Sequence, residues 1–140
     1  MTLSAIILAA GKATRMKSER VKVLHEICGR PMLGYVLDAC RQVGVTKLFV
    51  VVGHDKERVM QTYKNDADIT WVVQTEQKGT GHACLVCQEA VQAAGLLSLT
   101  GGSSAGNTFV LCGDGPLIRA DTLRQLLAKH EQDHSAITLA

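Results

Sequence analysis

The chain has 140 residues, of which 46% are hydrophobic and 20% charged, and its formal net charge is +2. These values predict about one globular domain with its own core, and they exclude an intrinsically disordered chain. The small net charge, together with only one Trp, two Tyr and two Phe, gives no reason to expect a nucleic-acid partner. No apolar run is long enough to cross a membrane and no basic segment precedes the first one, so we expect neither a membrane partner nor a signal peptide.

The five cysteines are scattered and odd in number, which is typical of reduced thiols and therefore favours a cytoplasmic protein. Only Cys84 and Cys87 are close together, as a Cys-x-x-Cys pair. The pair has no second cysteine pair or suitably spaced histidine pair to complete a zinc site, and it falls within an expected helix. We interpret both cysteines as small buried residues, with zinc or redox chemistry as the alternative.

Apolar runs alternate with amphipathic stretches along the chain. The expected elements, in order, are strand 3–8, helix 31–43, strand 47–52, helix 55–64, strand 69–73, helix 82–94, strand 109–112, helix 121–131 and the beginning of a fifth strand at 135–140. Pro31 suits the start of its helix, Gly44 the end, and Asp121 the N-cap of the last helix. Residues 21–27 are ambiguous, and residues 99–107 form a Gly/Ser-rich loop. Because the strands are continuously apolar, we predict an α/β fold, a mostly parallel sheet with helices on both faces.

The loop that follows the first strand, residues 9–22, contains small residues and then cations. Small residues let backbone N–H groups approach a phosphate closely, and Arg15 and Lys22 would add positive charge. Gly11-Lys12 is not part of a P-loop, because Ile6 stands where the first glycine of that motif belongs, and no G-x-G-x-x-G is present. We therefore predict a nucleoside triphosphate site; a strand exit with a chance Gly and Lys is the simpler alternative.

Two more unusual loops leave the same edge of the predicted sheet, at 74–81 and 113–116. The first carries amide and hydroxyl groups (Gln74, Gln77, Thr80) that suit the edge of a nucleobase, with His82 nearby as a candidate general base. The second carries Asp114, whose carboxylate would hold Mg²⁺; the alternative is a turn-forming Asp-Gly pair. No Ser or Cys nucleophile has a credible partner, so we expect direct attack by a phosphate oxygen of the substrate.

Five motifs in the same order resemble the uridylyltransferase domain of bacterial N-acetylglucosamine-1-phosphate uridylyltransferases: LAAGKATRM at 8–16, KVLH at 22–25, GRPML at 29–33, QKGTGHA at 77–83 and GDGPLI at 113–118. The resemblance covers nearly the whole chain. It implies a Rossmann-like nucleotidyltransferase fold that joins UTP and N-acetylglucosamine 1-phosphate into UDP-N-acetylglucosamine and pyrophosphate, with Mg²⁺.

The resemblance also implies roles for individual residues. Arg15 and Lys22 would act on the phosphates as catalytic residues, and Asp114 would bind the metal. The nucleotide-binding residues would be Leu8, Ala9, Ala10, Gly11, Lys22, Gln74, Gly79, Thr80, Cys112, Gly113 and Asp114, with Gln74, Gly79 and Thr80 reading uracil.

The chain departs from the family pattern at several positions. Ala13 stands where the family usually has Gly, Val21 where it has Pro, and Gly115 where it has Val, and the loop at 99–107 is longer than usual. The family's sugar-contacting residues and second metal ligand have no counterpart in this sequence. We therefore expect residues 1–140 to be the N-terminal portion of one nucleotidyltransferase domain, truncated after the fifth strand and lacking an acetyltransferase domain, which binds nucleotide with little turnover.

Two rival hypotheses remain open. A cytidylyl- or guanylyltransferase would share the same loops and differ in the base read by the Gln74 loop. A non-catalytic nucleotide-binding or interaction module would explain Ala13 and Val21 as signs of decay, and an exposed sheet edge would then favour a homo-oligomer.

Overall fold

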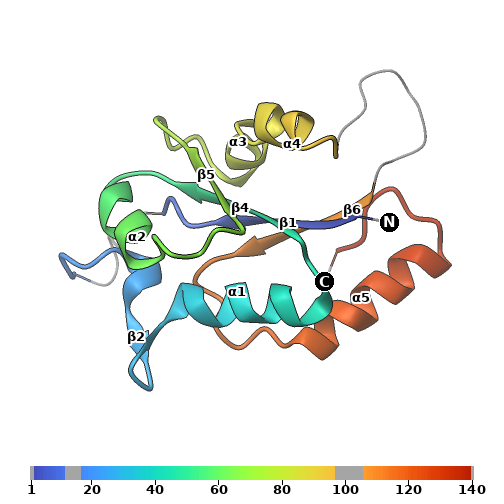
Figure 1. The fold of residues 1–140 in the computed structure, drawn as a ribbon, viewed down its shortest axis with the longest axis horizontal. Helices are drawn as coiled ribbons and strands as arrows, with labels where there is room; N and C mark the ends of the chain where they lie inside the picture. The colour runs from blue at the N-terminus through green and yellow to red at the C-terminus, as the bar shows by residue number, and fades with distance from the viewer. Residues whose placement is uncertain (1, 12–16, 97–105, 140) are drawn as a thin grey trace.

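The computed structural model describes residues 2–11, 17–96 and 106–139. Its centre is a four-stranded, fully parallel sheet with the strand order β5-β4-β1-β6. The strands are β1 (Thr2–Leu8), β4 (Lys47–Val52), β5 (Ile69–Val73) and β6 (Gly106–Cys112). The chain builds outward from β1 through β4 to β5 and then returns to the other side of β1 (Figure 1). This reversal places a switch point between β1 and β6, where parallel α/β sheets bind their ligands.

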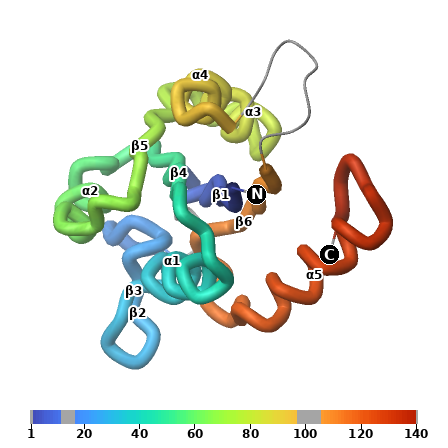
Figure 2. The backbone as a smooth tube through the Cα atoms, turned by 45° about the vertical axis from the view of Figure 1, so that its right-hand side comes forward, coloured from blue at the N-terminus to red at the C-terminus, as the bar shows by residue number. Residues whose placement is uncertain are grey.

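Helices cover both faces of the sheet, as predicted. α1 (Met32–Val43) and α5 (Ala120–Gln132) lie on one face, and the short helices α3 (Thr80–Leu85) and α4 (Gln88–Ala93) lie on the other (Figures 1 and 2). The protein has a hydrophobic core on each face of the sheet, and alternate residues of β4 pack into them. Leu48, Val50 and Val52 pack into the first core, and Phe49 and Val51 into the second. Burial on both faces is the reason that the strands are continuously apolar.

The region that the sequence leaves ambiguous, between β1 and α1, folds into a 3-10 turn and a small hairpin. The turn η2 (Lys22–Leu24) is followed by β2 (Glu26–Ile27) and β3 (Arg30–Pro31), which pair antiparallel. Cys28 and Gly29 both have positive φ, 51° and 75°, as a tight two-residue hairpin turn requires. The helix α2 (Lys56–Thr62) adds Val59 to the first core.

Three local expectations are wrong. Asp121 does not cap α5: the N-cap residue is Arg119, and Asp121 lies in the first turn, where it pairs with Arg124 at 2.5 Å. The single helix expected at 82–94 is interrupted at Val86–Cys87, although Ala83, Cys87 and Val91 still share one core.

The third concerns the expected fifth strand. Residues 135–139 are not a strand, and Ile137 and Leu139 are 78% and 90% exposed. A strand is stable only when it pairs with a neighbour, and these residues pair with none of the described strands. In the parts of the chain that the structure describes, no helix has the length and apolar character needed to cross a membrane.

Candidate active site

The three loops singled out in the sequence begin at one edge of the sheet. The register aligns Leu8 with Val51 on one side and with Cys112 on the other, so the strands end nearly level. The first residue of each loop is still held by the neighbouring strand: Ala9 N–H donates to Val51 O (2.8 Å), Gly113 N–H to Leu8 O (2.9 Å) and Gln74 N–H to Val52 O (2.8 Å). The loops are therefore anchored along one edge of the sheet, with the end of β4 between the second loop and the first.

These anchors also decide which backbone groups remain for a ligand. The N–H groups of Ala9 and Gly113 and the carbonyl of Leu8 are used within the sheet. Backbone donors for a phosphate in the first loop therefore begin at Ala10 and Gly11, and Gly11 is exposed, with open space where a Cβ would stand. The resemblance treats residues 8–11 as equivalent, whereas the fold divides them into two anchoring and two accessible residues.

Lys22 and Asp114 meet across the switch point. The Lys22 ammonium forms an ion pair with the Asp114 carboxylate, and the two side chains are 39% and 30% exposed. Between their loops lies Gly113, where an added Cβ would stand 3.1 Å from Leu8 O and 3.3 Å from Val23 Cγ1. Glycine favours this close approach, because an added Cβ would press on β1 and on the first loop. The pair brings a cation from the first loop and a carboxylate from the third to one point of the sheet edge.

The second loop folds over the same edge. Gln74 is 5% exposed, and its Nε2 lies 2.9 Å from His82 Nδ1 and 3.5 Å from Gly79 O. Gly79 has φ 93° and ψ −178°, a conformation that is essentially restricted to glycine, and it leads directly into Thr80, the first residue of α3. Nδ1 of His82 is engaged by the amide of Gln74, so the imidazole holds the Gln74 side chain in place.

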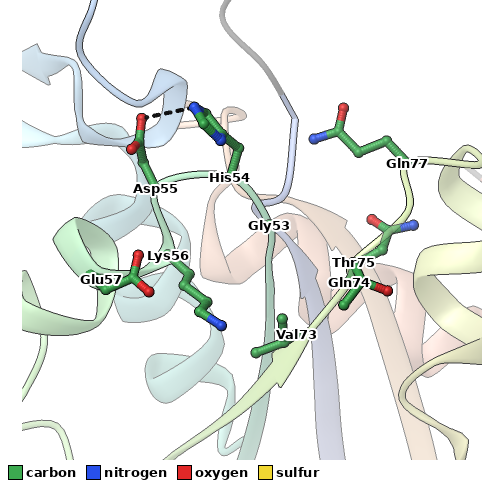
Figure 3. Close-up of a pocket in the computed structure, with 9 residues that line it drawn as sticks. All are labelled: Gly53, His54, Asp55, Lys56, Glu57, Val73, Gln74, Thr75 and Gln77. Atoms are coloured by element: carbon green, nitrogen blue, oxygen red, sulfur yellow. Dashed lines mark ion pairs between the residues drawn. The ribbon is translucent and has the colours of Figure 1, made fainter.

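Gln77 links the second loop to the first. Its Nε2 donates a hydrogen bond to Ala10 O. A cavity of about 430 Å³ lies beside this link, between the loops that follow β4 and β5, as Figure 3 shows. Its lining residues are Gly53, His54, Asp55, Lys56, Glu57, Val73, Gln74, Thr75 and Gln77.

Residues 53–57 are the part of this edge that the sequence reasoning missed. The pattern marks them only as the end of a strand and the start of a polar helix. Yet an added Cβ on Gly53 would stand 3.1 Å from both the Cβ and the carbonyl oxygen of Ala10, so the β4 exit packs directly on the first loop. Their position directly after a predicted strand of a parallel sheet would have indicated them, because ligands bind beyond the carboxyl ends of such strands.

The predicted site residues that the structure describes lie at this edge. They are Leu8, Ala9, Ala10, Gly11, Lys22, Gln74, Gly79, Thr80, Cys112, Gly113 and Asp114. Arg15, Lys12 and Ala13 are outside the described residues. The role of each residue toward a nucleotide stays a prediction.

The donor set fits a metal that arrives with its substrate. Over residues 2–11, 17–96 and 106–139, no three His, Cys, Asp or Glu side chains cluster as a metal-binding group. Asp114 offers a single, partly exposed carboxylate. Mg²⁺ is commonly held by one or two carboxylates, with substrate phosphates and water completing the coordination. Asp114 therefore offers a carboxylate that would suit Mg²⁺ beside a phosphate group.

A parallel α/β sheet with a small-residue loop and a Lys–Asp pair at its switch point is typical of α/β proteins that bind phosphate-bearing ligands there. Residues 5–140 match the MobA-like NTP transferase domain, and the chain belongs to that family.

The chain is similar to curated proteins over nearly all of its length. It is 48% identical to the bifunctional protein GlmU of Geobacter sulfurreducens over 137 residues, which is 98% of this chain and 27% of that protein. It is 49% identical to the protein of the same name in Thermobifida fusca, over 97% of this chain and 27% of the relative. The chain thus spans about a quarter of the length of these relatives.

Solved structures support the fold. Rv0371c from Mycobacterium tuberculosis superposes with a TM-score of 0.67 at 22% identity, covering 91% of this chain and 59% of that one. A nucleotidyl transferase from Methanothermobacter thermautotroptrophicus gives a TM-score of 0.65 at 23% identity, covering 92% and 57%. At these identities the likeness concerns the fold alone.

Proposed function

We propose that this chain carries the nucleotide site of a uridylyltransferase that makes UDP-N-acetylglucosamine and pyrophosphate from UTP and N-acetylglucosamine 1-phosphate. The observation that carries the proposal is the contact between Lys22 and Asp114 across the β1–β6 switch point. The sequence motifs and the 48% identity to a bifunctional protein GlmU over 98% of the chain support the choice of substrates.

In this proposal the chain's residues position charge rather than form covalent bonds, as is usual for phosphoryl and nucleotidyl transfer. A phosphate oxygen of the sugar phosphate attacks the α-phosphorus of UTP; the new P–O bond forms as the bond to the bridging oxygen breaks, and pyrophosphate leaves with the electron pair. Lys22 neutralises charge on the α-phosphate, and the N–H groups of Ala10 and Gly11 donate to phosphate oxygens. Mg²⁺, held by Asp114 and the phosphates, would further neutralise the triphosphate.

The ion pair keeps both charged groups in place before the nucleotide arrives. Without a ligand, Asp114 neutralises Lys22 in a partly exposed setting, where an ion pair contributes roughly 0–1 kcal/mol to stability. Such a weak pair is exchanged at little cost when a triphosphate and a metal supply stronger partners. Lys22 then turns to phosphate, and the carboxylate to the metal.

The orientation of Gln74 favours uracil over cytosine. Its amide nitrogen is directed to His82 and Gly79, which leaves Oε1 to face a base, and Figure 3 draws this oxygen on the cavity side of the amide. A carbonyl oxygen only accepts hydrogen bonds. When a base presents its N3 to Oε1, uracil donates through N3–H and cytosine does not, because N3 of cytosine is an acceptor; cytosine would have to shift to donate through its N4 amino group. Guanine, with a donor at N1, is the second candidate on the same reasoning.

Calorimetry with UTP and Mg²⁺ tests the proposal on the wild type, Lys22→Ala and Asp114→Ala. We expect both variants to lose about tenfold to a hundredfold in affinity, the range for removing a hydrogen bond to a charged group. Lys47→Ala, at the opposite end of β4, and Asp121→Ala, in the first turn of α5, are matched controls that should bind like the wild type. Failure of the wild type to bind any uridine nucleotide would refute the proposal.

The base preference needs a separate measurement. Thermal shifts with UTP, CTP, GTP and ATP, each with Mg²⁺, should give the largest stabilisation with UTP. An equal shift with CTP would contradict the role given to Gln74 Oε1, while leaving the phosphate site intact.

A further inference from the structure

Lys22 lies in a very short turn, whose position depends on contacts with other parts of the chain. The turn η2 has three residues and no side-chain N-cap, and residues 17–20 before it are exposed. Its own hydrogen bonds run from Leu24 N–H to Val21 O (2.9 Å) and from His25 N–H to Lys22 O (3.2 Å). A 3-10 turn has poorer hydrogen-bond geometry than an α-helix and is rarely stable by itself.

The side chain of His25 closes over this turn. Its Nδ1 lies 3.2 Å from Val21 O and 3.1 Å from Lys22 O, the same two carbonyls that accept the turn's own backbone bonds. Carbonyl oxygens only accept, so Nδ1 carries the proton and is shared between them. The imidazole therefore ties the backbone of Lys22 to that of its predecessor.

Two further contacts connect this turn to helix α1 and to the loop after β6. The carbonyl of His25 accepts the N–H of Met32, the first residue of α1, at 2.9 Å. Val23, the middle residue of the turn, is 3% exposed and lies against Gly113, next to Asp114. Lys22 is thus held between helix α1 on one side and the β6 loop on the other.

From this geometry we infer that His25 is a positioning residue for Lys22. Its Nδ1–H fixes the turn so that the Lys22 ammonium reaches Asp114 and, on the function proposed above, the α-phosphate of the nucleotide. The positioning of Lys22 toward Asp114 is independent of the nucleotide; only the effect on binding rests on the proposed function.

The decisive variants are His25→Asn, His25→Gln and His25→Ala. The amide nitrogen of Asn stands near the place of Nδ1, whereas that of Gln extends toward the place of Nε2. A zero-length carbodiimide cross-linker joins an ammonium to a carboxylate only when the two are in contact, so mass spectrometry of the Lys22–Asp114 cross-link reports the position of Lys22 without any ligand. Urea unfolding of each variant identifies the conditions in which it is folded.

We expect the cross-link yield of His25→Asn to stay close to that of the wild type. In His25→Gln and His25→Ala it should fall about threefold to tenfold, the range for losing one hydrogen bond. Equal yields in all four proteins would overturn the inference. So would an Asn variant as impaired as the Ala variant, because the ring would then act through packing rather than through Nδ1.

The binding of UTP with Mg²⁺ should follow the same order, with Asn retained and Gln and Ala weakened. If the wild type cross-links but binds no UTP, the proposed function fails and the positioning inference stands. If the cross-link falls in Gln and Ala while UTP affinity does not, His25 positions Lys22, and the effect of that positioning on nucleotide binding is refuted.

The wild type gives a test that needs no variant. ¹⁵N NMR of the neutral histidine rings should show His25 protonated on Nδ1, because the tautomer is set by the hydrogen bond that the ring makes. A neutral His25 ring protonated on Nε2 would exclude donation to the two carbonyls and overturn the inference.

Discussion

Two charged clusters in this molecule are similarly exposed but differ in the number and geometry of their contacts. At the sheet edge, Lys22 and Asp114 form one partly exposed pair between two loops. At the C-terminal end of α1, Arg41 donates to both carboxylate oxygens of Asp68 at 2.8 Å and to Asp66 at 2.7 Å. The hydrogen bonds between Arg41 and Asp68 raise the pKa of the guanidinium and lower the pKa of the carboxyl group.

The difference distinguishes charged residues that hold the scaffold together from charged residues that can exchange partners with a ligand. The Arg41 cluster is bidentate and ties the end of α1 to the turn before β5, so its charges are already satisfied by one another. The Lys22–Asp114 pair is single and joins the two loops of the switch point, and in the proposed function the nucleotide and the metal replace these partners. The cluster with several hydrogen bonds therefore marks the scaffold, and the single pair between two loops marks the candidate site.

The largest effect on the site side is expected at Gly79. Its φ of 93° with ψ of −178° costs any other residue roughly 1–3 kcal/mol. Gly79→Ala should therefore lower the free energy of unfolding by about that amount, as measured in urea, and should weaken UTP binding because the second loop shifts. Gly81→Ala is the matched control: an added Cβ there meets nothing within 4 Å, and because Ala favours a helix over Gly it should lower neither quantity. Equal behaviour of the two variants would show that the loop does not depend on this backbone conformation.

The next largest effects are expected from Arg41→Ala and Lys22→Ala, compared for both the free energy of unfolding and UTP affinity. Arg41→Ala should lower the free energy of unfolding by about 1–2 kcal/mol, a value that allows for partial solvent screening of the cluster. UTP affinity should not change. Lys22→Ala should do the reverse, with a change in stability of roughly 0–1 kcal/mol and a clear loss of binding. Urea unfolding and calorimetry on both variants measure this, and a loss of UTP affinity in Arg41→Ala would break the distinction.

The acid stability of the chain should report the Arg41 cluster. The pKa of Asp68 is lowered in the folded state, so its contribution to stability is present above its unfolded pKa, near about 4. That contribution is lost as the pH falls through the lower folded pKa. Unfolding free energy measured between about pH 5 and pH 2 should therefore drop more steeply in the wild type than in Arg41→Ala. Lys129→Ala, which removes an exposed pair with Asp133, should keep the wild-type slope, and a similar slope in all three proteins would contradict the assignment.

The smallest expected effect concerns Val21, where the resembling family has proline. The φ of Val21 is −54°, within the range that a proline ring imposes. Val21→Pro should raise the free energy of unfolding by about 0.4–1 kcal/mol, because it restricts the unfolded chain without straining the turn. The urea midpoint measures this. A loss of stability instead would show that the backbone before Lys22 does not accept a proline.

Local patterns were sufficient for most elements but not for their ends. The apolar run at 47–52 and the stripe of α1 predicted β4 and α1 correctly, and Gly44 ends α1 in the left-handed conformation, with φ 94°. The N-cap assigned to Asp121 was wrong because a capping residue is defined by its backbone conformation, which Arg119 supplies. The motifs placed three loops on one edge, yet they gave no sign of residues 53–57, whose part depends on packing against Ala10.

The sequence by itself determined the class of fold, the parallel sheet with covering helices and the loops of the candidate site, because periodicity and small-residue motifs act over a few neighbouring residues. Only the tertiary structure decided that Lys22 meets Asp114, that Gln74 turns its nitrogen to His82, and that residues 135–139 form no strand. These outcomes depend on contacts between segments far apart in the chain, and no local pattern encodes which segments become neighbours.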